Sequence, residues 1–175
     1  PDADELAQQK SWRLNYTYSD FLQRSDKVRQ KELLGNSTPH WQCLTTQAEL
    51  ENLLRSGRKG FFKRRHGSGG YTLWSIEEVK KDTQIVESVT ASLGDWYFED
   101  WVEGKPYSVQ CVKYGNSEDV LIFGFSEQQI DQGKFFVGSH ISPLSDISGA
   151  ILSGLTEAIR NISSLLTGYE GFFGI

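Results

Sequence analysis

The sequence predicts an α+β protein of two lobes, and three features of its pattern carry this prediction. Up to about residue 95, short strands alternate with short helices. Two strands near 107–114 and 119–126 then flank a turn at 115–117, as in an antiparallel hairpin. Between Ile147 and Leu166, apolar residues recur every three or four positions, the spacing of an amphipathic helix. Together these elements are typical of an α+β fold. We therefore divide the 175 residues into a lead-in segment, 1–24, a first lobe, 25–98, and a second lobe that begins with a hinge strand, 99–175.

The first lobe opens with a helix whose ends are marked by the residues beside them. Ser25 or Asp26 can cap its start, and Gly35 can end it. A second helix is expected after the capping box that Thr46 forms with Glu49. The other elements expected here are strands at 40–44, 60–64, 71–74 and 96–102 and a short helix at 77–81. The last residues of the chain, 171–175, are expected to be a strand that is cut short.

Charge and cysteine content exclude several classes of protein. The chain has 18 Lys and Arg against 23 Asp and Glu, a net charge of -5, which argues against a domain that binds nucleic acid with its whole surface. Its apolar runs are far shorter than the roughly 20 residues of a membrane span. Cys43 and Cys111 are the only cysteines, and their spacing is not that of a zinc site or a disulfide framework. We expect a cytoplasmic protein without a membrane partner.

The residues that suggest chemistry lie around Lys63 and the loop after it. Lys63 is on an expected strand, and the series 66–70, His-Gly-Ser-Gly-Gly, follows it. An ammonium beside backbone amides that no Cβ obstructs suits a polyphosphate. Because the loop joins two strands, it is neither a Walker A loop nor a dinucleotide-binding turn. We expect a flap over phosphates, the role of a glycine-rich hairpin in protein kinases.

Two other interpretations of this region stay open. The glycines can be an ordinary hairpin connection, with Lys63 a solvated cation on its strand. The basic residues can instead form a patch for nucleic acid, although no recognisable RNA- or DNA-binding module accompanies them. The residues of this basic patch are Arg55, Arg58, Lys59, Lys63, Arg64 and Arg65.

A series of motifs in one order resembles the ATP-grasp superfamily. Residues 25–31, Ser-Asp-Lys-Val-Arg-Gln-Lys, are similar to the first lysine site of the family, and 62–70 are similar to its strand lysine with Gly-Ser-Gly-Gly. Residues 98–104, Phe-Glu-Asp-Trp-Val-Glu-Gly, resemble its hinge strand. One branch, the carboxylate-amine ligases that include tyramine-glutamate ligase, is further resembled at 106–109, 127–130, 137–143 and 168–175. The resemblance covers about residues 25–175.

The resemblance implies an ATP-grasp fold, with a nucleotide in a cleft between two α+β lobes. It also implies an ATP-dependent ligase with ATP and Mg²⁺ as cofactors and with a small-molecule carboxylate and an amine, or a thiol, as substrates. In such a ligase the carboxylate attacks the γ-phosphate, and the nucleophile then opens the acyl phosphate. Two alternatives are a noncatalytic nucleotide-binding module and a nucleic-acid binder that uses the basic residues of 55–66.

Carried over position by position, the resemblance assigns residues to ATP but none to a catalytic role. Lys27 and Lys63 match the two lysines that touch phosphates, 66–70 match the flap, and 99–102 match the hinge that reads adenine. The residues assigned to ATP are Lys27, Lys63, His66, Gly67, Ser68, Gly69, Gly70, Glu99, Asp100, Trp101 and Val102, with Glu103 and Gln129 as further candidates.

The sequence departs from the family in three places. Lys105 and Pro106 occupy the turn where many members have a glutamate for the ribose. The metal ligands of the family follow the strand that ends here at Ile175, so we expect no metal ligand within the chain. The amino-terminal domain that usually precedes the grasp is missing, and the chain starts at Pro1 and has no Met. We therefore expect a fragment with an incomplete second lobe, inactive alone. Its substrates and oligomeric state are not predicted.

Overall fold

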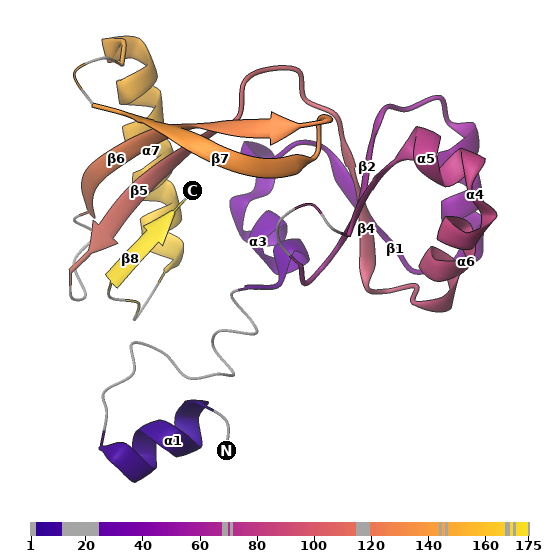
Figure 1. Ribbon diagram of the computed structural model, residues 1–175, viewed down its shortest axis with the longest axis horizontal. Coiled ribbons are helices and arrows are strands. Elements are labelled where there is room, and N and C mark those ends of the chain that lie inside the picture. Colours follow the sequence, from indigo (N-terminus) through magenta and orange to yellow (C-terminus); the bar gives the residue numbers. More distant parts are fainter. Residues whose placement is uncertain are drawn as a thin grey trace. The chain divides into compact units, whose positions relative to one another are not determined.

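The computed structural model is an α+β chain with two four-stranded antiparallel sheets (Figure 1), which confirms the predicted fold class. It forms two compact units. The first unit comprises 24–104 and 132–135, and the second comprises 1–23, 105–131 and 136–175. The residues that the structure describes are 3–11, 25–67, 70, 72–114, 120–143, 145, 147–166, 169 and 171–174.

The first unit has a sheet of strand order β1-β4-β2-β3, with helices on both of its faces (Figure 1). The predicted strands and helices of this region are confirmed within a few residues, but helix α6 was not predicted. The elements are α3 (Lys27–Leu34), the 3-10 turn η1 (Gly35–Ser37), β1 (Trp41–Leu44), α4 (Gln47–Arg55), β2 (Gly60–Arg64), β3 (Leu73–Ser75), α5 (Ile76–Lys81), α6 (Thr83–Ala91) and β4 (Trp96–Asp100).

Side chains next to the helix ends explain where these helices start. The Asp26 carboxylate accepts hydrogen bonds from the backbone N–H groups of Val28 (3.0 Å) and Arg29 (3.3 Å), so it caps α3. Thr46 and Glu49 form the predicted capping box of α4. Helix α6 begins after a further cap, Asp82, and its β-branched sequence, Thr-Gln-Ile-Val-Glu-Ser-Val-Thr-Ala, hid it from prediction because such residues have weak helix propensity.

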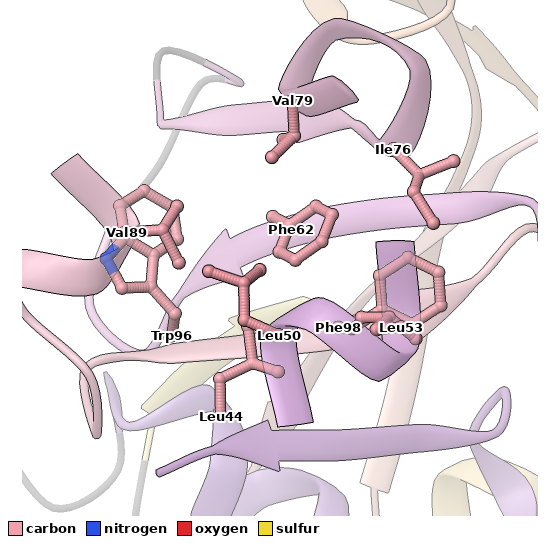
Figure 2. Close-up of a cluster of buried hydrophobic side chains, with 9 residues drawn as sticks. All are labelled: Leu44, Leu50, Leu53, Phe62, Ile76, Val79, Val89, Trp96 and Phe98. Atoms are coloured by element: carbon pink, nitrogen blue, oxygen red, sulfur yellow. The ribbon is translucent and has the colours of Figure 1, made fainter. Parts of the chain in front are cut away.

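The core of the first unit lies on one face of its sheet (Figure 2). Alternate residues of the strands point to this face, and helices α4, α5 and α6 cover it with aliphatic side chains. Burying each large side chain contributes about 1.5–3 kcal/mol. The buried residues of this core are Leu44, Leu50, Leu53, Phe62, Ile76, Val79, Val89, Trp96 and Phe98. The residues between them, Lys63 on β2 and Tyr97 and Glu99 on β4, therefore point to the opposite face, toward α3.

The second unit has a sheet of strand order β7-β6-β5-β8. The predicted hairpin, the long helix and the last strand are confirmed, with Ser148 as the helix cap. Strand β6 continues past the expected end at residue 126, and β7 was not predicted. A helix also lies in the lead-in segment, where no element was expected. The elements are α1 (Ala3–Lys10), β5 (Tyr107–Lys113), β6 (Val120–Asp131), β7 (Phe135–Ser142), α7 (Gly149–Leu165) and β8 (Gly171–Gly174).

A buried lysine joins β5 to the end of α7. Lys113 is only 5% exposed, and its ammonium donates hydrogen bonds to the backbone oxygens of Ser163 (2.8 Å) and Leu166 (2.9 Å). The last carbonyl groups of a helix carry partial negative charge, so a cation there is favourable. Lys113 thus caps α7 from the neighbouring strand.

The described helices include none with the length and apolar character that crossing a membrane requires. Cys43 and Cys111 are both free thiols.

Candidate functional site

Three lysines gather around one carboxylate in the first unit. Lys27 and Lys31 are on α3, Lys63 is on β2, and Glu99 is on β4. The Lys63 ammonium lies 2.5 Å from Oε1 of Glu99, and the Lys31 ammonium pairs with Oε2 of the same side chain. We call these four residues the lysine cluster. Three ammonium groups face one carboxylate there, so the cluster carries excess positive charge.

Local structure brings these side chains together. Lys27 and Lys31 are four residues apart on α3, so they lie on the same face of the helix. The start of α3 is fastened to the end of β2, because the Lys27 backbone N–H donates to the Arg65 carbonyl at 3.0 Å. The Asp26 carboxylate also accepts from the Arg65 guanidinium, at 2.5 Å and 3.2 Å. This anchoring holds the first turn of α3 beside the strand that carries Lys63.

The register of β2 and β4 brings Lys63 to the carboxylate. Lys63 pairs with Tyr97, and Phe61 pairs with Glu99. Paired residues of antiparallel strands point to the same face, and diagonal neighbours lie within reach of long side chains. The lysine and the glutamate therefore meet diagonally across two strands that are far apart in the sequence.

Lys27 differs from the other two lysines because, within the described part of the chain, its ammonium has no ion pair. Burial lowers the pKa of Lys27, and the nearby Lys63 ammonium lowers it further. A partly buried cation beside a second cation is unfavourable unless an anion forms ion pairs with both. A ligand with several negative charges would neutralise both cations at once.

Glu99 remains ionised although it is buried. Burial would raise the pKa of Glu99, but Lys63 and Lys31 together hold it below its usual range. The Lys31 ammonium also lies 5.6 Å from the centre of the Tyr97 ring, a cation–π contact. Burial raises the pKa of Tyr97, so its hydroxyl stays neutral.

The other hinge side chains do not join the lysine cluster. The Asp100 carboxylate accepts from the Arg58 guanidinium, at 2.9 Å from Nε and 2.8 Å from Nη2. Trp101 and Val102 follow β4 and are 48% and 61% exposed, with the Trp101 ring 5.4 Å from that of Phe61. Of the four predicted hinge residues, only Glu99 contributes its side chain to the lysine cluster. Glu103 is exposed.

The predicted flap is described only in part, because Ser68 and Gly69 lie outside the described residues. His66 and Gly67 are exposed. Gly70 has a φ of +83°, and a Cβ there would overlap the carbonyl oxygen of Lys134, in the turn after β6. The Lys134 ammonium lies 2.5 Å from Oε1 of Glu78, on α5. The end of the loop is thus packed against residues 132–135 of the first unit.

Gln129, the last candidate, is an exposed residue of β6 in the second unit. Two contributors to the site, Lys31 and Arg65, were not predicted from the sequence. The spacing of four residues from Lys27 could have indicated Lys31, because it places both lysines on one helix face. No local signal pairs Arg65 with Asp26, which lies 39 positions away.

The basic residues of 55–65, the alternative nucleic-acid patch, lie in different environments, with Arg55 and Lys59 exposed. Lys63, Arg65 and Arg58 are each paired with a different carboxylate. The Arg64 guanidinium lies 5.0 Å from the centre of the Trp96 ring. The three ion pairs leave less positive charge for a nucleic-acid backbone.

The described residues contain no group of three or more His, Cys, Asp or Glu side chains that could hold a metal ion. The oxygen ligands that Mg²⁺ prefers are therefore not gathered in the described part of the chain. The lysine cluster, by contrast, supplies ammonium groups that can donate hydrogen bonds to phosphate oxygens.

Comparison with known proteins identifies a family. The family model of the ATP-grasp domain matches residues 24–175. No curated protein matches the chain.

Solved structures of several ligases and carboxylases have a similar fold. One is the carboxyaminoimidazole ribonucleotide synthase of Aspergillus clavatus complexed with ATP (20% identity, TM-score 0.72, covering 99% of this chain and 46% of that one). Another is the biotin carboxylase domain of the Hydrogenobacter thermophilus 2-oxoglutarate carboxylase with MgADP (16%, 0.72, 97% and 40%). A third is the L-amino acid ligase of Bacillus licheniformis (13%, 0.68, 97% and 40%). The chain thus spans less than half the length of these structures.

Proposed function

Because the chain belongs to the ATP-grasp domain family, we propose that its lysine cluster binds the phosphates of ATP. We also propose that the chain is part of an ATP-dependent ligase. The observation that carries the proposal is the Lys27 ammonium, which has no ion pair within the described residues and lies close enough to Lys63 for the two charges to interact. A triphosphate satisfies both cations at once. A single carboxylate, such as Glu99, does not.

The proposed division of work follows from charge. Lys27 and Lys63 offset the negative charge of the transferring phosphoryl group, which is the main contribution that a protein makes to phosphoryl transfer. The backbone of 99–102 meets the adenine, and the residues of 66–70 cover the phosphates. Mg²⁺, where bound, would neutralise charge on the phosphates, and we assign it no ligand in this chain.

We propose that the reaction joins a carboxylate to an amine or a thiol. An oxygen of the carboxylate attacks the γ-phosphorus, the bond to the β-phosphate oxygen breaks, and ADP leaves. The nucleophile then attacks the acyl carbon, inorganic phosphate leaves, and the nucleophile loses a proton. The similarity of fold to an L-amino acid ligase supports this reaction class. The motifs at 106–109, 127–130, 137–143 and 168–175 favour the tyramine-glutamate ligase branch.

Calorimetric titration of the 175-residue chain with ATP and Mg²⁺ tests the binding step. We expect Lys63→Ala and Lys27→Ala each to weaken ATP binding by about 1.5–3 kcal/mol, the range of hydrogen bonds to charged groups. Lys80→Ala is the matched control, since Lys80 is an exposed lysine paired with Glu77 and its loss changes the net charge equally. Unchanged affinity in both Lys27 and Lys63 variants would remove the cluster from the nucleotide site.

A second experiment separates a ligase from a noncatalytic nucleotide binder. The protein, with whatever polypeptide accompanies it naturally, is incubated with ATP, Mg²⁺ and sets of amino acids and amines. We expect release of ADP and phosphate only when a carboxylate and an amine are both present. Tight ATP binding without such release for any pair would favour the noncatalytic module.

A further inference from the structure

We propose that Lys31 is a positioning residue: it masks the charge of Glu99, so that a carboxylate can stay beside the two ammonium groups that meet the phosphates. This inference rests on the proposed function, because it concerns the same anion site. Nothing in the motif that assigns Lys27 and Lys63 gives Lys31 a role.

The contacts of Glu99 are divided between two lysines. Its Oε1 atom meets the Lys63 ammonium at 2.5 Å, and its Oε2 atom meets the Lys31 ammonium. The side chains of Glu99 and Lys31 are both only 11% exposed, whereas that of Lys63 is 24% exposed. Lys63 is thus the member of the trio that is more open to a ligand, and Lys31 is enclosed.

Binding of a polyphosphate changes the balance of this trio. When the Lys63 ammonium turns to a phosphate, Glu99 loses much of the attraction that keeps it ionised in a buried place. A buried carboxylate close to a triphosphate repels it, unless a cation remains on the carboxylate. Lys31 is that cation, and the Tyr97 ring at 5.6 Å helps to hold it.

The role of Lys31 therefore becomes visible when the anion binds, and it depends on Glu99. A residue that touches phosphate directly would be needed whether or not position 99 is charged. A residue that masks Glu99 is needed only while position 99 carries a carboxylate. This difference separates the two roles in a double-mutant cycle.

The test uses the 175-residue chain, calorimetry, and two probes, ATP and inorganic tripolyphosphate. We expect Lys31→Ala to weaken binding of both probes about tenfold, which corresponds to a loss of about 1.4 kcal/mol in binding free energy. Lys31→Arg should stay within about threefold of the original protein, because a cation remains. In the Lys31→Ala background, Glu99→Gln should restore tripolyphosphate binding to within about threefold, since the repelling charge is gone.

Glu99→Gln alone gives a second measurement that does not need the Lys31→Ala protein to fold. The amide keeps a hydrogen-bond acceptor but removes the negative charge, so we expect this variant to bind tripolyphosphate at least as tightly as the original chain. Lys80→Ala, the exposed control, should change neither affinity by more than about twofold.

The outcomes distinguish this inference from the proposed function. If Lys27→Ala and Lys63→Ala weaken binding but Lys31→Ala does not, Lys31 has no masking role and the anion site stands. If Glu99→Gln fails to rescue Lys31→Ala, or itself weakens tripolyphosphate binding, the masking role is also wrong. If no lysine variant changes the affinity of either probe, the proposed function fails together with it.

Discussion

The two sheets of the protein differ in the side chains that they carry outside their hydrophobic cores. In the first unit, Lys63 and Glu99 project from β2 and β4 into an ionic cluster that α3 partly buries. In the second unit, β6 and β7 expose apolar side chains instead, among them Leu121 (54%), Val137 (63%) and Ile141 (70%). Exposed apolar residues are ordinary at a protein surface, whereas buried charges are costly unless paired. The buried ionic face of the first unit therefore supports the proposed anion site.

The largest expected difference between the sheets comes from their aromatic residues. Phe62 on β2 is fully buried, whereas Phe136 on β7 is 51% exposed. We expect Phe62→Ala to lower the free energy of unfolding by about 3–5 kcal/mol through lost burial and a cavity. Phe136→Ala should cost less than about 1 kcal/mol. Urea titration followed by circular dichroism measures both, and equal losses would contradict the assignment of the core.

A smaller contrast is expected between the ion pairs of the two units. Glu99→Ala leaves the enclosed Lys31 ammonium and the Lys63 ammonium without their carboxylate, so we expect a loss of about 3 kcal/mol in unfolding free energy. Glu127 pairs with Lys105 at 3.1 Å in the second unit, where the lysine is 69% exposed. Glu127→Ala should therefore cost much less than Glu99→Ala. If the Glu99→Ala protein were as stable as the original, the two lysines would not depend on this carboxylate, and the prediction would be wrong.

Acid should weaken the first unit before the second. The pKa values of Asp26, Glu78 and Glu99 lie below their ordinary values in the folded chain, and all three belong to the first unit. Stability from these groups is complete above their unfolded pKa values and is lost as the pH falls through the lower folded ones, by up to about 1.4 kcal/mol per pH unit for each proton bound. Hydrogen exchange of the two sheets between pH 5 and pH 3 measures this, since these limits bracket the ordinary range of about 4. Earlier exchange in β5 and β6 would be the contrary result.

The smallest effect is expected at the turn of residues 132–135, which belongs to the first unit. Lys134→Ala removes the ion pair with Glu78, a carboxylate that also accepts hydrogen bonds from Ser75 at the start of α5. Because Glu78 keeps its capping role, we expect a loss of only about 0.5–1 kcal/mol. Glu78→Gln should cost more than Lys134→Ala, and thermal unfolding of the two variants tests this order.

Local signals made much of the fold predictable. Asp26, Thr46 with Glu49, and the spacing of apolar residues in α7 each determine structure within one or two helical turns. Helix α6 and the last residues of strand β6 escaped prediction for a different reason. Residues 83–91 are rich in β-branched residues, and the polar series Ser126 to Asp131 resembles a loop, so their structure depends on the sheets against which they pack.

The site was predictable only as far as its single residues. Lys27, Lys63 and Glu99 were named from the sequence, but their grouping depends on the register of β2 and β4, which local sequence does not determine. One feature of the site could be predicted from the expected strand alone. Glu99 and Asp100 are neighbours on it, so their side chains must point to opposite faces. The alternation alone excludes a shared side-chain role, although the assignment of both to ATP stays a prediction.

Lys113 gives the second unit a natural reporter of its motions. Lys105, at 69% exposed, is open to an amine-reactive label, whereas the Lys113 nitrogen is enclosed by two carbonyl groups at the end of α7. The label can reach Lys113 only when β5 separates from that helix end. The slow reaction of this one amine, followed by mass spectrometry, would therefore record how often the second unit opens.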